Sequence, residues 1–107
     1  HRAAPLLLAE GFRSTIVNIS ELFKWLKKTG GEPALDKVLL FAKSIELQEI
    51  TFDDAVLAGS FSAQHKLYLG DAIMLAVSVN HDITLMTTDS DFDKVNVPGA
   101  KIKFIKK

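Results

Sequence analysis

Acidic residues stand where several segments of the chain begin or end. Asp71 opens the apolar stretch "DAIMLAVSVNH", Glu21 follows the β-branched stretch "STIVNIS", and Asp89, Asp91 and Asp93 alternate after a third apolar stretch. Carboxylates packed together repel one another, and a divalent cation removes that repulsion. Oxygen ligands without cysteine or histidine suit Mg²⁺ or Mn²⁺, which activate water and clamp phosphate in phosphodiester hydrolysis. The acids therefore predict a metal site for hydrolytic chemistry.

The elements that position these acids alternate in type. The pattern predicts strands over residues 14–20, 45–50, 83–88 and 101–105 and helices over residues 1–12, 20–31, 33–44, 51–64 and 71–81. Strands that alternate with helices favour an α/β fold, here three layers (α/β/α) with a mainly parallel sheet. A length of 107 residues fits one domain over residues 1–107.

Geometry brings the acids to one edge of that sheet. The helix at 71–80 would be about 15 Å long and the strand at 83–88 about 17–20 Å, and a tight turn joins them. They must run antiparallel, so Asp71 and Asp89 should face each other, with Asp91 within reach. If the strand at 14–20 is parallel to the other, Glu21 arrives at the same carboxyl edge, where open α/β sheets bind ligands.

Each acid also has a simpler interpretation. Asp71 could be a helix N-cap, and Glu21 could be a first-turn acid with no further role. Asp89, Asp91 and Asp93 could form a solvated turn, which is the interpretation we favour for Asp93. The combination is more specific than any one member.

Composition excludes several classes of protein. There is no cysteine, so a disulfide scaffold and a thiolate site are excluded, and we expect a cytoplasmic location. The formal net charge is zero, which weighs mildly against a large phosphate-binding surface. No apolar run reaches the roughly 18 residues of a membrane span, so no membrane partner is expected.

Other side chains carry weaker signals. His1, His65 and His81 have no metal-ligand spacing. Aromatic residues of the helices, among them Trp25, are expected in the core, as are Phe23 and Phe41. The lysines at 24, 27 and 28 predict a solvated helix face, with contact to phosphate as the alternative.

At the acidic residues the sequence resembles PIN domains, in particular the VapC-like toxin ribonucleases. The matching stretches are "NISELFKWL", "LGDAIMLAVSVNHDITLMTTDSDFDKV" and the short strand that follows. The resemblance covers nearly the whole chain. It implies a PIN-like fold and a Mg²⁺- or Mn²⁺-dependent endoribonuclease. Glu21, Asp71 and Asp89 would be the catalytic, metal-binding acids, Asp91 an auxiliary metal ligand, and Thr87 a side chain that orients the carboxylates.

The resemblance also implies partners. The substrate would be RNA, the protein would form a homodimer, and a small antitoxin would place its chain tail in the acidic site. The protein would then be the toxin of a toxin–antitoxin pair.

The sequence departs from this family at its start. The resemblance implies a central first strand that ends in an aspartate, and we expect that about 20–25 residues covering that strand and part of the first helix are missing here. The strands at 14–20 and 83–88 then need another segment between them, since buried backbone groups must be paired. Two alternatives therefore stay open: a non-catalytic PIN-like module that binds RNA or protein, and a phosphatase-like hydrolase with the same acids.

Overall fold

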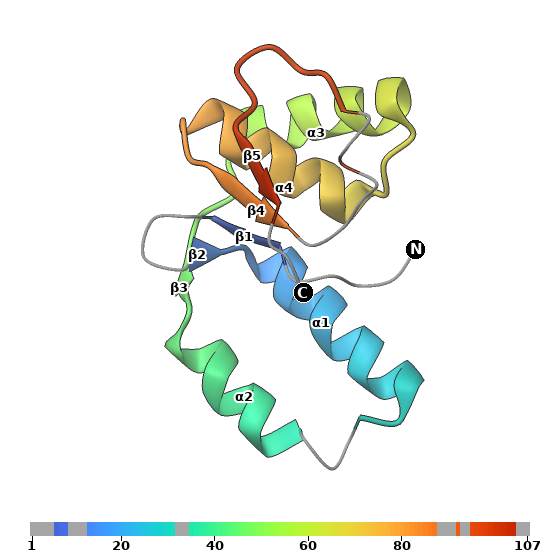
Figure 1. Cartoon of the computed structure of the whole chain (residues 1–107), viewed down its shortest axis with the longest axis vertical. Helices are drawn as coiled ribbons and strands as arrows, with labels where there is room; N and C mark the ends of the chain where they lie inside the picture. The colour runs from blue at the N-terminus through green and yellow to red at the C-terminus, as the bar shows by residue number, and fades with distance from the viewer. Residues whose placement is uncertain (1–5, 9–12, 32–34, 88–91, 93–94, 105–107) are drawn as a thin grey trace.

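Helices and strands alternate along the chain, as Figure 1 shows. The computed structural model describes residues 6–8, 13–31, 35–87, 92 and 95–104. The elements are β1 Leu6–Leu8, β2 Arg13–Ser14, α1 Ile16–Thr29, α2 Leu35–Ser44, β3 Glu46–Leu47, α3 Phe52–His65, α4 Leu69–Asn80, β4 Leu85–Thr87 and β5 Ile102–Phe104. None of the helices among these residues has the length and apolar character needed to cross a bilayer.

One five-stranded sheet has the order β3-β2-β1-β4-β5. β2 is parallel to β3 and β4 is parallel to β5, whereas β1 is antiparallel to both of its neighbours. Four of the five strands therefore point in the same direction. This confirms the α/β class with a mainly parallel sheet. It also means that the carboxyl ends of β2 and β4 lie at the same edge.

The central strand of the sheet comes from a segment that the sequence pattern predicted to be helical. Leu6–Leu8 pair with Leu85–Thr87 on one side, and Leu8 pairs with Arg13 on the other. The helix predicted over residues 1–12 is thus wrong for the part that the structure describes. Pairing on both sides outweighs the intrinsic helix preference of leucine. The strand needed between β2 and β4 is β1, in the antiparallel direction.

The strand predicted over residues 14–20 is also wrong, because only Arg13–Ser14 is extended and α1 begins at Ile16. The Thr15 hydroxyl accepts a hydrogen bond from the Asn18 N–H at 3.3 Å and caps the helix. Gly30 ends the helix in the left-handed conformation, with φ of 72°. A cap early in the segment decides between helix and strand for a β-branched run that could form either.

The other predicted elements are found close to their expected places, although β3 keeps only two of its six predicted residues. α3 starts with a capping box, in which the Thr51 hydroxyl and the Asp54 carboxylate each accept a backbone N–H of the other residue. α4 is the most deeply buried helix. Its fully buried apolar residues are Ala72, Met74, Leu75, Ala76 and Val77.

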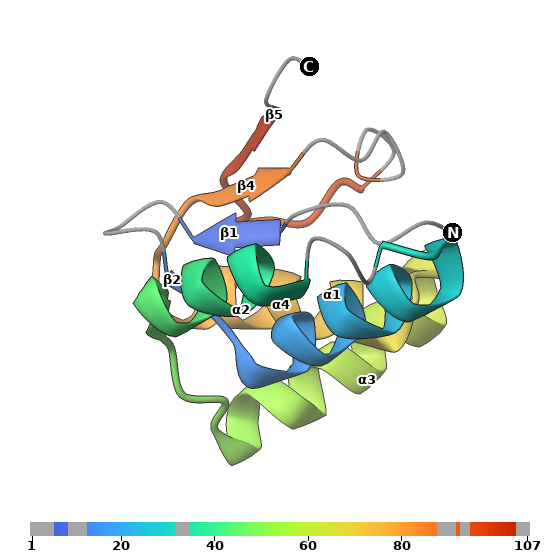
Figure 2. The ribbon, with the colours of Figure 1, turned by 90° about the horizontal axis from the view of Figure 1, so that it is seen from below.

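The core packs around α4. α3 and the strands β1 and β4 contact it, and α1 contacts it as well, with Glu21 against Gly70. Ser78 donates a hydrogen bond to the Ile83 carbonyl and so fixes the turn from α4 into β4. Figure 2 shows the four helices on the same side of strands β1, β4 and β5, with α1 and α2 in front of α4.

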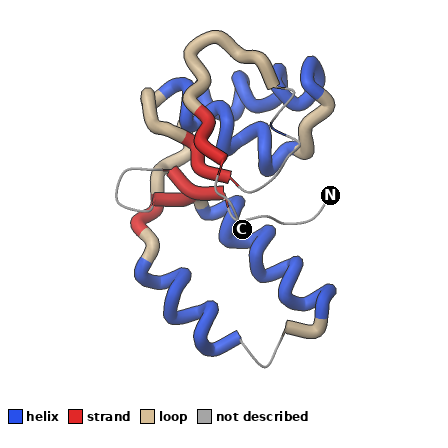
Figure 3. The backbone as a smooth tube through the Cα atoms, viewed as in Figure 1, coloured by secondary structure: helices blue, strands red, loops and turns tan. Residues whose placement is uncertain are grey.

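Helices α1 and α2 extend from the strands to one end of an elongated molecule of 41 × 27 × 24 Å, as Figure 3 shows. Each has only one buried apolar side chain, Leu26 in α1 and Ala42 in α2. Trp25 and Phe41 are exposed, so the expectation that they belong to the core is wrong.

Candidate metal centre

The Glu21 carboxylate lies directly against the backbone of α4. A β-carbon on Gly70 would lie 1.5 Å from Glu21 Oε1 and 2.5 Å from its Cδ, far inside contact distance. Any side chain at position 70 would therefore displace this carboxylate. Glycine at this place lets an acid from α1 reach the first turn of α4, and the next residue along that helix is Asp71. Glu21 thus reaches α4 one residue before Asp71, which is 50 positions later in the sequence.

Neither acid has the simpler role considered from the sequence. The N-cap of α4 is Tyr68, so Asp71 lies inside the first turn and is not the cap. Glu21 is in the middle of α1 and is not a first-turn acid. Asp71 is only 3% exposed. Both carboxylates lie at the positive end of the α4 dipole, which favours negative charge.

The electrostatics of Glu21 reflect its environment. Burial raises the pKa of the Glu21 carboxyl, and the nearby Lys24 ammonium partly opposes that rise. An acid held in this way is less stable in its charged form than an exposed one. A bound cation would favour the ionised form of this carboxyl.

Three polar residues that the sequence analysis did not single out lie at the start of α1, the helix that carries Glu21. Ser14 and Thr15 are fully buried at the end of β2. The Asn18 amide donates to the Ser14 hydroxyl at 3.0 Å, and the Thr15 hydroxyl donates to Met74 Sδ at 3.2 Å. Asn18 precedes Glu21 by one helical turn and so shares its face of α1. The sequence spacing predicts this shared face only if the helix is taken to begin after Thr15.

Thr87 is the last residue of β4 and is fully buried. Thr87 therefore lies at the carboxyl edge of the sheet, where β2 also ends, at Ser14. Glu21 does not follow a strand directly as expected, because α1 intervenes. It lies five residues beyond the start of α1, or about 7.5 Å along the helix axis.

The remaining predicted ligands cannot be placed. Asp89 and Asp91 lie outside the described residues, as does Asp93. Over residues 6–8, 13–31, 35–87, 92 and 95–104, no three histidine, cysteine or acidic side chains are grouped closely enough to hold a metal ion. Of the predicted acids, the structure places Glu21 against Gly70, the residue that precedes Asp71 in α4.

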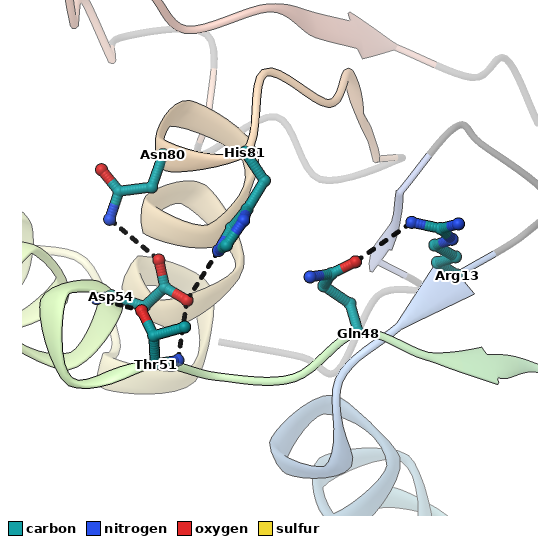
Figure 4. A network of polar contacts seen from close by, with 6 residues as sticks. All are labelled: Arg13, Gln48, Thr51, Asp54, Asn80 and His81. Atoms are coloured by element: carbon teal, nitrogen blue, oxygen red, sulfur yellow. Dashed lines mark hydrogen bonds and ion pairs between the residues drawn. The ribbon is translucent and has the colours of Figure 1, made fainter.

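A second buried carboxylate, Asp54, has a different environment, shown in Figure 4. It is fully buried, and it accepts hydrogen bonds from the Thr51 N–H at 2.9 Å and the Asn80 amide at 2.8 Å, with His81 Nε2 at 3.0 Å. Burial alone would raise the pKa of Asp54, but these hydrogen bonds outweigh it and the pKa is lowered. Asp54 joins the start of α3 to the end of α4 and is a structural acid.

Comparison with known proteins agrees with the fold. The family model described as PIN domain matches residues 1–98. No curated protein matches the chain. Among solved structures, a chain in a toxin–antitoxin complex from Klebsiella pneumoniae is similar in fold, with a TM-score of 0.60 and 24% sequence identity. The match covers 86% of this chain and 70% of that one.

Proposed function

Because this chain belongs to the PIN domain family, we propose that it is a metal-dependent endoribonuclease, and that it is the toxin of a toxin–antitoxin pair. The observation that carries the proposal is the contact of the Glu21 carboxylate with Gly70, beside the buried Asp71. An acid of α1 reaches the N-terminal turn of α4, and that turn carries Asp71. This is the arrangement that a cation and a phosphate would require.

Glu21 and Asp71 would hold a Mg²⁺ or Mn²⁺ ion, and we propose Asp89 and Asp91 as further ligands. All-oxygen ligands suit either ion, and PIN domain nucleases generally use divalent metals. The raised pKa of Glu21 fits this assignment, since a carboxyl that is partly buried without a cation becomes more acidic when one binds. The ion would lower the pKa of a bound water and neutralise charge on the scissile phosphate.

The residues around the acids would keep them in place. Gly70 lets Glu21 approach, Thr87 would orient the carboxylates at the end of β4, and the Asn18–Ser14 hydrogen bond fixes the first turn of the helix that carries Glu21. A carboxylate held by its neighbours loses little freedom when substrate binds, which is how positioning contributes to rate.

The partners of the protein follow from the same proposal. The similar solved chain belongs to a toxin–antitoxin complex, which supports an antitoxin protein as the binding partner here. We propose in addition that the protein acts on RNA in the cytoplasm and forms a homodimer.

The test is cleavage of a single-stranded RNA by wild-type protein and by Asp71→Asn. We expect cleavage with Mg²⁺ or Mn²⁺, none with EDTA, and a loss of at least about 100-fold in the variant, because the ligand charge is removed while size is kept. The matched control is Asp53→Asn, an exposed acid in the first turn of α3, which should cleave like the wild type.

Full activity of a contaminant-free Asp71→Asn preparation would exclude Asp71 from the site. Two further results would refute the nuclease assignment. RNA binding without metal-dependent cleavage would leave the chain as a binding module, and hydrolysis of a small phosphomonoester in place of RNA would indicate a phosphatase.

A further inference from the structure

The helix that carries Glu21 presents a cationic and aromatic stripe that continues away from the acidic pair. Lys24, Trp25 and Lys28 follow Glu21 at three, four and seven residues, and positions with this spacing lie on one face of a helix. Lys24 is about 4.5 Å and Lys28 about 10 Å farther along the helix axis than Glu21. All three side chains are exposed, whereas Leu26 between them is buried toward the domain.

Trp25 is the unusual member of this stripe. Its side chain is 39% exposed although it belongs to the helix that builds the acidic site, and it is the only tryptophan of the chain. An exposed aromatic ring next to ammonium groups is the pattern of a single-stranded nucleic-acid site, where rings stack on bases and cations bind the backbone. Interface cores between proteins are instead depleted in lysine.

We propose that this stripe is the RNA path of the enzyme, in which Trp25 stacks on a base while Lys24 and Lys28 bind the phosphates that flank the cleaved bond. The inference rests on the proposed function, because it takes the Glu21 and Asp71 pair as the place of cleavage. Lys24 follows Glu21 by one helical turn on the same face of α1, so the cationic stripe begins next to this acid. The stripe supplies local positive charge to a chain whose net charge is zero.

The test is binding without cleavage, measured in EDTA. A single-stranded RNA of about 12 nucleotides is added to the protein while the fluorescence of Trp25 is followed. We expect saturable quenching, since no other tryptophan contributes to the signal. Anisotropy of a labelled copy of the same RNA gives the affinity of each variant, and circular dichroism checks that each variant folds.

Two substitutions separate stacking from charge. Trp25→Leu keeps an apolar side chain and should weaken binding about tenfold. Lys28→Gln should weaken binding and lower the slope of log K against log salt by about 0.7, the value for one phosphate contact with a single strand. The matched control is Lys43→Gln, which removes the same charge from the last turn of α2 and should leave the slope unchanged.

Several outcomes overturn the proposal. RNA that binds without changing Trp25 fluorescence, or equal effects of Lys28→Gln and Lys43→Gln, would exclude the stripe as the path. A fluorescence change that depends on the protein concentration and not on the RNA concentration would mean that a second copy of the chain covers Trp25. Wild-type protein that binds RNA through Trp25 but does not cleave it when Mg²⁺ is added would refute the proposed nuclease and leave the RNA path intact.

Discussion

Gly70→Ala should disturb the candidate metal centre without destabilising the fold. The new β-carbon would lie 1.5 Å from Glu21 Oε1, whereas real β-carbons stay at least 3.0 Å from such an atom, so the carboxylate must retreat by about 1.5 Å or more. The atom in the way is the end of a flexible side chain, so the helix itself need not move. Alanine is favoured over glycine in a helix by roughly 0.5–1 kcal/mol. Stability should therefore stay the same or rise slightly.

Activity should respond in the opposite direction. A displacement of about 1 Å in a positioned group lowers a rate by about 100-fold, so Gly70→Ala should lose RNA cleavage at that level. The assay pairs metal-dependent cleavage of a single-stranded RNA with urea unfolding of the same preparation. Loss of activity together with unchanged or higher stability is the expected combination.

A second substitution tests the cause. Glu21→Asp shortens the side chain by one methylene, about 1.5 Å, which is close to the retreat that the Gly70→Ala substitution would impose. Combined with Gly70→Ala it should recover part of the activity, and the double variant should exceed the product of the two single effects. Full activity in Gly70→Ala alone would show that the Glu21 carboxylate is not needed where the structure places it, and the reasoning would fail.

Other predictions concern the acids and their stability. Asp54→Ala should lower the free energy of unfolding, measured in urea, by about 2–4 kcal/mol. The reason is that the Thr51, Asn80 and His81 groups would lose this acceptor. The control is Asp53→Ala, at an exposed position. Since the folded pKa of Asp54 is lowered, its contribution is complete above its usual value of 3.8 and is lost as the pH falls through the lower folded value. The unfolding free energy should thus drop in acid below about pH 4, less steeply in Asp54→Asn, and an equal drop in both proteins would contradict this. Mg²⁺ at about 100 times its Kd should stabilise the wild type by about 2.7 kcal/mol, which is measured as a rise in Tm. Asp71→Asn should abolish this rise. A rise that persists in the variant would mean that the ion binds elsewhere.

Parts of this site could be predicted from the sequence because their signals are local. The apolar run after Asp71 can only be a buried helix, and the short turn to Leu85–Thr87 makes that helix and strand antiparallel. The position of Thr87 at the sheet edge follows directly. The contact between Glu21 and Gly70 does not, because it joins two helices whose packing no local pattern encodes.

The errors have physical causes. The segment after Ser14 is rich in β-branched residues, and such a run fits a strand or a buried helix equally well until the Thr15 cap is recognised. Leucine favours a helix, and the sequence pattern therefore predicts one at Leu6–Leu8. Pairing with β2 on one side and β4 on the other determines the extended conformation instead. Aromatic residues at helical spacing are usually buried, which is the reason for predicting Trp25 in the core. Its exposure depends on how α1 packs against the rest of the domain.

The antiparallel β1 has a consequence for the way this protein opens. It joins the β3-β2 pair to the β4-β5 pair, and among the described residues these two pairs share no other strand contact. The three residues of β1 therefore connect the two halves of the sheet, and their partners in β4 lie about 80 positions later in the sequence. When β1 detaches, both halves should lose their shared neighbour together. The amides of Ser14 and Met86 should then exchange their hydrogens with one common opening free energy, as members of a single cooperative unit.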